Sequence, residues 1–319
     1  MNLIPPTFSD VQSAAKAIEG KVHRTPIRFY PALSELLEAD VWVKHENFQL
    51  LGAFKVRGGI NLISKATDDE RARGYVSASS GNHGQSIAYA ARLFGAKCTM
   101  VLPEGANPAK AASSKALGAE LLFHGDVFER AKELAESLAE ERGYRFIHAA
   151  NEPDLIAGVG TYTLEVHEDL KDIDVMIAPV GAGSGACGAC IVMNEVSPET
   201  HMIGVQSAGA PAAHHAWKSG EFSTIKMNTI AEGLATEGAY ELPISILRER
   251  LPQFELVDDS EILNAIRIYV ETTRTLVEHA GAASLAAAIK LKDQLKGKRV
   301  VLVASGGNIT VDQLKTALG

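Results

Sequence analysis

The stretch VMIAPVGAGSGACG, residues 175–188, decides the fold class that this sequence predicts. Its first five residues form a short apolar run that ends at turn residues, which predicts a buried β-strand. The glycine-rich turn that follows leads into small residues, typical of a helix that packs closely on a sheet. A strand, a turn and a helix in this order are typical of α/β folds, in which ligands bind beyond the carboxyl ends of the strands.

The same alternation runs along the rest of the chain. Short apolar runs predict strands at residues 41–44, 75–78, 98–102, 120–123, 146–148, 175–179, 202–206 and 299–304. Helical patterns predict helices at residues 82–94, 108–117, 126–142, 154–170, 186–196 and 259–280. We therefore expect an α/β fold with two open, mostly parallel sheets and helices on both faces.

The length of 319 residues favours two domains. Residues 74–151 contain enough predicted strands and helices for a small, mobile α/β domain. Residues 1–73 and 152–319 are expected to form the larger domain, with the N-terminal segment joining it and the small domain inserted between its two parts.

Composition excludes several classes of partner. With 31 Lys and Arg against 39 Asp and Glu, the net charge is −8, which gives no general attraction for nucleic acid or for an anionic membrane. No stretch approaches the length of a membrane span, and the opening MNLIPPTFSD lacks the pattern of a secretory signal. The three cysteines do not make a disulfide framework, so we expect a cytoplasmic protein.

Three further segments carry candidate chemistry. GAFKVRGG, residues 52–59, places Lys55 after an aromatic residue at a predicted helix start, although most lysines are simply surface residues. SASSGNHGQS, residues 77–86, runs from a strand end into a helix, whose first N–H groups bind carboxylate or phosphate well. VASGGN, residues 303–308, ends the last strand with a hydroxyl and two glycines. The last two segments are also compatible with an ordinary helix cap or turn.

Two motifs leave alternatives open. Residues 183–188 match G-x-G-x-x-G, the fingerprint of a dinucleotide fold, so an NAD-dependent oxidoreductase is a competing hypothesis. That fold expects an acid about 20 residues further on, and the next predicted strand ends in Gln206 instead. Cys187 and Cys190 form a CxxC without enough partners for zinc, and we expect them to be packing residues.

Taken in order, these motifs resemble the β-family of pyridoxal 5′-phosphate (PLP) enzymes, fold type II. That family includes threonine dehydratases, serine dehydratases and serine racemases. The matching segments are HRTP at residues 23–26, the lysine motif at 44–58, SSGNHG at 79–84, the glycine loop at 181–188 and SGGN at 305–308. Each segment is short, but the ordered set covers nearly the whole chain.

The resemblance implies how a cofactor would be held. Lys55 would form a Schiff base with PLP and later move protons at the substrate Cα, and Phe54 would pack beside the pyridine ring. Asn82 would hydrogen-bond the 3′ oxygen, and Ser305 would face the pyridine nitrogen. The phosphate would be held by the backbone N–H groups of Gly181, Ala182, Gly183 and Ser184.

The resemblance also implies a substrate loop. Its members would receive the substrate carboxylate and are Ser79, Ser80, Asn82 and His83. Ser80 matches the residue that works from the opposite face of the cofactor in racemases. Gln206 replaces a glutamate that helps to bind a divalent cation in many relatives, so no metal is expected. His279 stands where proline is common; it could lie near the substrate, but we favour a position on a helix surface.

The implied function is a PLP-dependent ammonia-lyase that converts L-threonine or L-serine to a 2-oxo acid and ammonia. The alternatives are a serine or other amino acid racemase, or a lyase for another 3-hydroxy amino acid, such as hydroxyaspartate or a hydroxyectoine-pathway intermediate. A binding protein without catalysis is a further alternative. Family members are often homodimers, which we expect here. Little sequence follows Ser305, so we do not expect a feedback domain for isoleucine.

Overall fold

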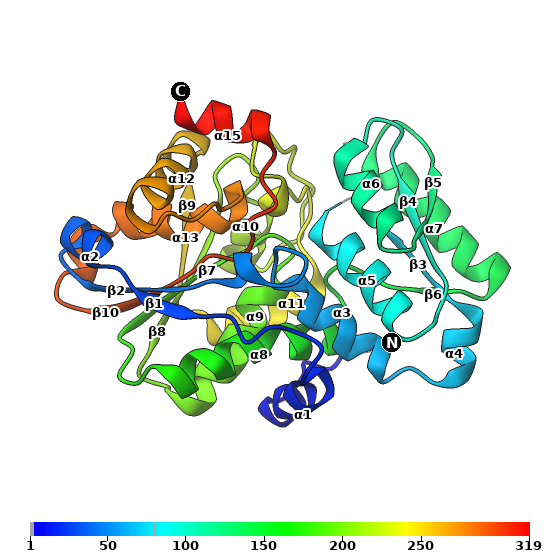
Figure 1. The fold of residues 1–319 in the computed structure, drawn as a ribbon, viewed down its shortest axis with the longest axis horizontal. Coiled ribbons are helices and arrows are strands. Elements are labelled where there is room, and N and C mark those ends of the chain that lie inside the picture. Colours follow the sequence, from blue (N-terminus) through cyan, green and yellow to red (C-terminus); the bar gives the residue numbers. More distant parts are fainter. Residues whose placement is uncertain (1–2, 80, 107) are drawn as a thin grey trace.

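The computed structural model describes residues 3–79, 81–106 and 108–319. These residues form two units, each built on its own β-sheet, that lie side by side in Figure 1. We call them the large unit, around a six-stranded sheet, and the small unit, around a four-stranded sheet. The expected α/β class with two mainly parallel sheets is confirmed.

The large sheet has the strand order β1-β2-β10-β7-β8-β9, and only β1 runs antiparallel to its neighbour. Its strands are β1 (Ile27–Phe29), β2 (Asp40–Lys44), β7 (Val175–Pro179), β8 (His201–Ser207), β9 (Gln253–Val257) and β10 (Arg299–Val303). Its helices include α1 (Phe8–Ile18), α2 (Pro31–Leu37), α3 (Lys55–Ser64), α8 (Pro153–Asp169), α9 (Ser184–Val196), α10 (Ala212–Ser219), α11 (Glu241–Arg250), α12 (Asp259–Thr273), α13 (His279–Lys290), α14 (Lys292–Leu295) and α15 (Val311–Leu318). Two short 3₁₀ helices are η1 (Glu46–Phe48) and η2 (Glu232–Leu234).

Both faces of the large sheet are buried, as expected for parallel strands. Side chains alternate between the faces, so Leu302 belongs to one apolar core while its neighbours Val301 and Val303 belong to the other. Helices α8 and α9 cover the second face, and α12 and α13 cover the first (Figure 1). The sheet therefore presents its strand ends, and not its faces, as places for chemistry.

The small sheet has the strand order β5-β4-β3-β6, and all of its strands are parallel. They are β3 (Tyr75–Ala78), β4 (Cys98–Leu102), β5 (Glu120–Phe123) and β6 (Arg145–Phe146). The helices around it are α4 (Asp68–Arg73), α5 (Asn82–Leu93), α6 (Pro108–Ala116) and α7 (Phe128–Arg142). Helix α7 packs on one face, and α5 and α6 pack on the other.

Helix α3 joins the two units and begins at Lys55. Its apolar side chains, including Ile60 and Ile63, share one core with β3, β4 and α5 of the small unit. Two adjacent glycines permit this close packing: a Cβ on Gly58 would lie 2.8 Å from the Leu155 carbonyl of α8, and a Cβ on Gly59 would lie 2.3 Å from Ser86 Oγ of α5. The lysine that the sequence singled out therefore starts the helix on which both units pack.

One helix prediction is wrong. The single helix expected over residues 259–280 is two helices, because α12 ends at Thr273 and α13 begins at His279. Arg274 ends α12 in a left-handed conformation, with φ 57° and ψ 34°. Glycine usually marks such an end, and an arginine gives no such signal. The apolar pattern also continues past Arg274, so the sequence did not predict the break.

Other differences lie at sheet edges. The sequence did not predict the edge strands β1 and β9. The strand expected at residues 146–148 is shorter, since β6 ends at Phe146. His148 leaves the ladder because its Nδ1 accepts hydrogen bonds from the backbone N–H groups of Ala150 (2.9 Å) and Asn151 (3.0 Å).

Within the described part of the chain, no helix is both long and apolar enough to cross a membrane.

The contact between α8 and α9 gives a first prediction. A Cβ on Gly188 would lie 2.7 Å from the Gly160 Cα, so we expect Gly188→Ala to lower the free energy of unfolding by about 1–3 kcal/mol. Alanine otherwise favours helices over glycine by about 1 kcal/mol, so destabilisation would show that the backbone contact dominates. Gly238→Ala is the control, because its Cβ would meet nothing within 4 Å. Equal denaturant midpoints for both variants and the wild type would contradict this packing.

Candidate functional site

Four separate segments meet at the carboxyl ends of β10 and β7. The lysine segment pairs with the turn after β10, since the Phe54 N–H donates to the Ser305 carbonyl (3.2 Å) and the Gly307 N–H donates to the Gly52 carbonyl (2.8 Å). The glycine turn after β7 and the loop after β3 approach from two other sides. The segments that the sequence singled out therefore lie together, although Lys55 and Ser305 are 250 residues apart in the chain.

The amine of Lys55 points at the glycine turn. Its Nζ donates to Ser184 Oγ over 2.7 Å and lies 5.2 Å from the centroid of the Phe54 ring. Burial lowers the pKa of the Lys55 amine to about 8, with Cys187 nearby as a smaller, opposing influence. A lysine in this state is unprotonated far more often near neutral pH than a surface lysine, which suits it to nucleophilic attack and proton transfer.

The glycine turn offers a cradle of free donors. In the part of the chain that the structure describes, no protein group accepts a hydrogen bond from the backbone N–H groups of residues 181–186. The first N–H of α9 with a partner is that of Cys187, which donates to the Gly183 carbonyl (3.0 Å). Free N–H groups at a helix N-terminus are suited to a phosphate group.

Backbone geometry requires glycine at two positions of this turn. Gly183 has φ 98°, which side-chain-bearing residues rarely adopt. A Cβ on Gly181 would lie only 2.2 Å from the Gly233 carbonyl oxygen of η2. The turn is therefore narrow and its donors are exposed to whatever lies beyond the strand end.

Phe54 packs against the start of α9. A Cβ on Gly185 would lie 3.1 Å from two carbons of the Phe54 ring, so glycine lets this ring approach the helix. Tyr162 of α8 meets Phe54 edge-on with centroids 6.2 Å apart, and its hydroxyl donates to the Gly185 carbonyl (3.0 Å). The ring is thus a fixed wall beside Lys55.

Asn82 is held by two side chains of the large unit. Its Nδ2 donates to Glu278 Oε1 (2.8 Å), and its Oδ1 accepts from Asn308 Nδ2 (2.7 Å). Burial raises the pKa of the Glu278 carboxyl, and Lys110 and the Asn82 amide oppose this. Sequence reasoning missed Glu278 as a site residue, because it lies inside the range predicted as one continuous helix; it is in fact the N-cap of α13.

The loop after β3 is described in part. Ser79 Oγ accepts from the Gly81 N–H (3.3 Å), and Ser80 lies outside the described residues. The His83 ring contacts the end of β3, with Nε2 3.2 Å from Ser77 Oγ, which in turn donates to the Ile147 carbonyl (2.7 Å). Burial, aided by the charge of Lys55, lowers the pKa of His83 to about 3, so this imidazole is neutral at pH 7.

Ser305 and His279 are both buried, with 5% of each residue exposed. No described group contacts the Ser305 hydroxyl by a hydrogen bond, so it is free to meet a ligand. The expectation that His279 lies on a helix surface is wrong: it is the first residue of α13, and burial lowers its pKa. The break before α13, which the sequence did not reveal, turns His279 inward.

The remaining candidate residues, Cys187, Cys190 and Gln206, are buried inside the protein. Cys187 and Cys190 are fully buried in the core between α9 and the sheet, which confirms the prediction that they are packing residues. Gln206 is also fully buried, and its Oε1 accepts from the His214 N–H (3.0 Å). The described residues contain no group of three His, Cys, Asp or Glu side chains that could hold a metal ion.

A buried ion network lies behind Lys55. Arg57 donates to both Glu46 (2.8 Å) and Glu165 (2.7 Å), and Lys44 donates to Glu165 (2.5 Å). Lys44, Glu46 and Arg57 have no exposed side-chain area, and Glu165 has 13%. The network connects β2, η1, α3 and α8, so it fixes the first turn of the helix that carries Lys55.

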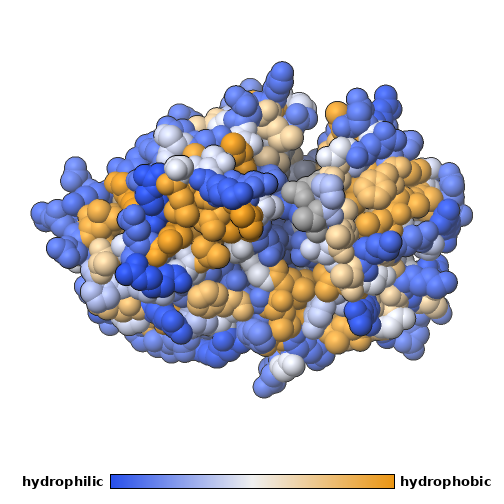
Figure 2. All heavy atoms as spheres, turned by 45° about the horizontal axis from the view of Figure 1, so that its top comes forward, coloured by the Kyte–Doolittle hydropathy of each residue, from blue (hydrophilic) through white to orange (hydrophobic). Residues whose placement is uncertain are grey.

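A shallow hollow of about 460 Å³ lies elsewhere, beside α10 and α11, and contains none of the predicted site residues. The space-filling view shows a notch between the two units at the upper edge of the molecule (Figure 2). We take the meeting point of the loops as the candidate site, because it combines a lysine of lowered pKa with free donors.

Known proteins resemble this chain over nearly its whole length. A sequence profile of the family described as "Pyridoxal-phosphate dependent enzyme" matches residues 18–306. The chain is 36% identical to an L-threonine ammonia-lyase of Thermotoga maritima over 97% of this chain and 77% of that protein. It is 32% identical to an L-threo-3-hydroxyaspartate ammonia-lyase of Saccharomyces cerevisiae, over 99% and 97% of the two chains.

A solved structure is similar over the whole fold. The maize serine racemase superposes with a TM-score of 0.93 at 28% identity, and the alignment covers 99% of this chain and 97% of that one.

The ion network gives a second prediction. Glu165→Gln removes the charge that pairs with Lys44 and Arg57, so we expect the free energy of unfolding to fall by about 3–5 kcal/mol. Glu168→Gln, on the same helix, breaks only an exposed pair with Arg24 and should cost at most about 1 kcal/mol. Similar unfolding midpoints for the two variants would show that the buried network does not hold α3 in place.

Proposed function

The chain belongs to the pyridoxal-phosphate-dependent enzyme family, and on that premise we propose that it is an ammonia-lyase of a small β-hydroxy amino acid. The reaction would convert L-threonine or L-serine to a 2-oxo acid and ammonia. The observation that carries the proposal is the Lys55 amine, with its lowered pKa, beside a row of free backbone donors. The two related ammonia-lyases support this reaction class.

The residues present fit PLP. The free N–H groups of residues 181–186 would hold its phosphate, and the Lys55 amine, 2.7 Å from Ser184 Oγ, would hold its aldehyde carbon. Phe54, Asn82 and Ser305 would surround the ring, as the family resemblance implies. When bound, PLP supplies an electron sink that weakens the bonds at the substrate Cα.

Lys55 would act as the proton carrier at Cα. Its pKa of about 8 leaves the amine able to accept and return a proton near neutral pH. The Oγ of Ser184 would steer the amine through their hydrogen bond. Phe54 would exclude water from one side of the reacting atoms, since its ring is packed against Gly185 and Tyr162.

Asn82 and Ser305 would set how strongly the PLP ring withdraws electrons. The Asn82 amide is restrained by Glu278 and Asn308, which fixes the direction of its remaining hydrogen-bonding capacity. Ser305 offers a neutral hydroxyl where a carboxylate would enforce a full positive charge on the ring nitrogen. A neutral partner gives a milder electron sink, which favours β-elimination over transamination.

The substrate carboxylate would bind at the N-terminus of α5, in the loop of Ser79, Ser80, Asn82 and His83. The helix dipole favours an anion there. The neutral His83 ring adds no charge at the carboxylate, so backbone and amide donors would do the binding.

A racemase is the second candidate, because of the similarity to a serine racemase. In that reading, Ser80 would carry the proton on the face opposite Lys55. A lyase for L-threo-3-hydroxyaspartate is the alternative within the same reaction class. We also propose a cytoplasmic homodimer, for which the family resemblance and the cysteine content are the support.

The function is tested with a panel of amino acids. We expect 2-oxo acid and ammonia from L-threonine or L-serine, at a higher kcat/KM than from L-threo-3-hydroxyaspartate. Lys55→Ala should abolish turnover and the visible absorption band of lysine-bound PLP. No 2-oxo acid from any member of the panel would reject the lyase, and D-serine formation without 2-oxo acid would establish the racemase. If the protein both racemises and eliminates, Ser80→Ala should remove D/L interconversion and leave elimination from the L-substrate.

The lowered pKa of Lys55 predicts a pH dependence. Only the unprotonated amine attacks an aldehyde, so the rate at which the PLP-free protein takes up PLP should rise with pH through a midpoint near 8. An unperturbed lysine would give a midpoint of about 10.4. Stopped-flow absorbance across this range measures the midpoint, and a value near that of a free lysine would contradict the buried environment of the amine.

A further inference from the structure

We propose that Lys110 and Glu232 are positioning residues that latch the small unit over the candidate active site. Lys110 lies on α6 of the small unit, and Glu232 lies on η2 of the large unit. The inference rests on the proposed function only for its kinetic consequence. Its structural consequence can be measured without any turnover.

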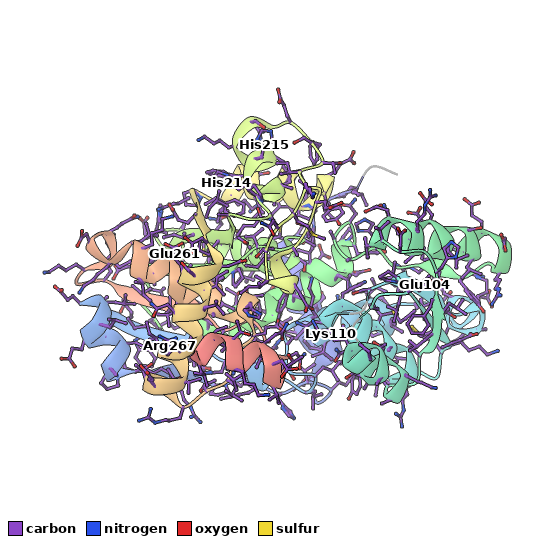
Figure 3. The ribbon with its side chains drawn as sticks, turned by 90° about the horizontal axis from the view of Figure 1, so that it is seen from above. Glu104, Lys110, His214, His215, Glu261 and Arg267 are labelled. Carbon is purple, nitrogen blue, oxygen red and sulfur yellow. The ribbon has the colours of Figure 1, made fainter. Side chains whose placement is uncertain are left out.

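The two side chains form an ion pair between the units. Lys110 Nζ contacts Glu232 Oε2, while Glu232 Oε1 accepts from Gln313 Nε2 of α15 (3.1 Å). Figure 3 shows Lys110 at the boundary between the small unit and α15. Only 16% of the Lys110 side chain is exposed, so this lysine is not an ordinary solvated surface residue.

This pair differs from the other ion pairs of the small unit. Among the described residues, the only other ion pair between the small unit (α4 to β6) and the large unit is Arg145–Glu152, and Arg145 also pairs with Glu70 of α4 within the small unit. Its partners, Glu70 and Glu152, lie close to the points where the chain enters and leaves the small unit. Lys110 and Glu232 are 122 residues apart, and no nearby chain connection holds them together.

Glu232 is attached to a segment that touches the site on two sides. The Gly233 carbonyl oxygen would lie 2.2 Å from a Cβ on Gly181, in the proposed phosphate turn. A Cβ on Gly233 would lie 2.7 Å from the Ala280 Cβ of α13. Movement of Glu232 would therefore shift backbone that is in direct contact with the proposed phosphate turn and with α13.

Lys110 also acts on the site electrostatically. Its charge opposes the burial-driven rise in the pKa of Glu278, the carboxylate that holds Asn82. The position of α6 therefore affects both η2 and Glu278. When the pair breaks, the small unit loses its ion pair to the large unit on the side opposite the points where the chain enters and leaves it. The site then opens.

The size of the effect follows from a two-state equilibrium. Loss of one partly exposed ion pair should shift the ratio of closed to open molecules by roughly 1.5–5-fold. If substrate binds productively to the closed form, its apparent affinity falls by the closed fraction that is lost. Because the closed fraction changes by no more than the closed-to-open ratio, we expect KM to rise by at most this factor, with a smaller change in kcat.

The test uses the PLP-loaded protein and the variants Lys110→Met and Glu232→Gln. Amide hydrogen exchange of α6, measured without substrate, should accelerate in both, and KM should rise as stated. The charge swap Lys110→Glu with Glu232→Lys should restore both readouts. The control is Arg130→Met with Glu133→Gln, an exposed pair within α7 of the same unit, which should leave both unchanged.

Wild-type exchange of α6 in both single variants would reject the latch. Altered single variants that the charge swap does not restore would reject the direct pairing of Lys110 with Glu232. Because exchange is measured without substrate, it decides the matter even if the amino acid panel shows no turnover. A failure of the proposed function is thus distinguishable from a failure of the latch.

Discussion

The buried network of Arg57, Glu46, Glu165 and Lys44 is the constraint on which the rest of the structure depends. Charges without solvent are costly unless each finds a partner in good geometry, so these four side chains accept only one arrangement of β2, α3 and α8. Arg57 lies two residues after Lys55 on α3. Fixing the guanidinium therefore fixes the position from which the Lys55 amine reaches Ser184.

The described surroundings of the Lys55 amine carry little charge. The amine donates to the Ser184 hydroxyl and lies near the Phe54 ring, the Cys187 thiol and a neutral His83. Burial in such surroundings disfavours the ammonium form, which is why the pKa of Lys55 falls to about 8. An anionic ligand would bring its own charge into this space and find donors already oriented, at no cost of rearrangement.

The two units are joined by contacts of different kinds. Apolar packing of α3 on α5 holds one side, and Ser86 of α5 donates to the Lys55 carbonyl (2.7 Å), so the small unit is bonded to the lysine's own backbone. The other side is held by polar contacts, Asn82 with Glu278 and Lys110 with Glu232. Polar contacts exchange with water far more readily than a packed core, which favours motion about α3.

The sequence by itself determined the α/β class and most strands, because apolar runs and glycine turns are local signals that no distant contact needs to complete. Which residues would gather around Lys55 was implied by the family resemblance of the ordered motifs. Only the tertiary structure decided which side chains from distant segments contact one another. The burial of His279 and the pairing of Glu278 with Asn82 arise between segments far apart in the chain. Glu165 and Lys44 are 121 residues apart, and no periodicity in the sequence reveals that they form a buried ion pair. Such pairings depend on how helices pack on the sheets, which local propensity does not specify.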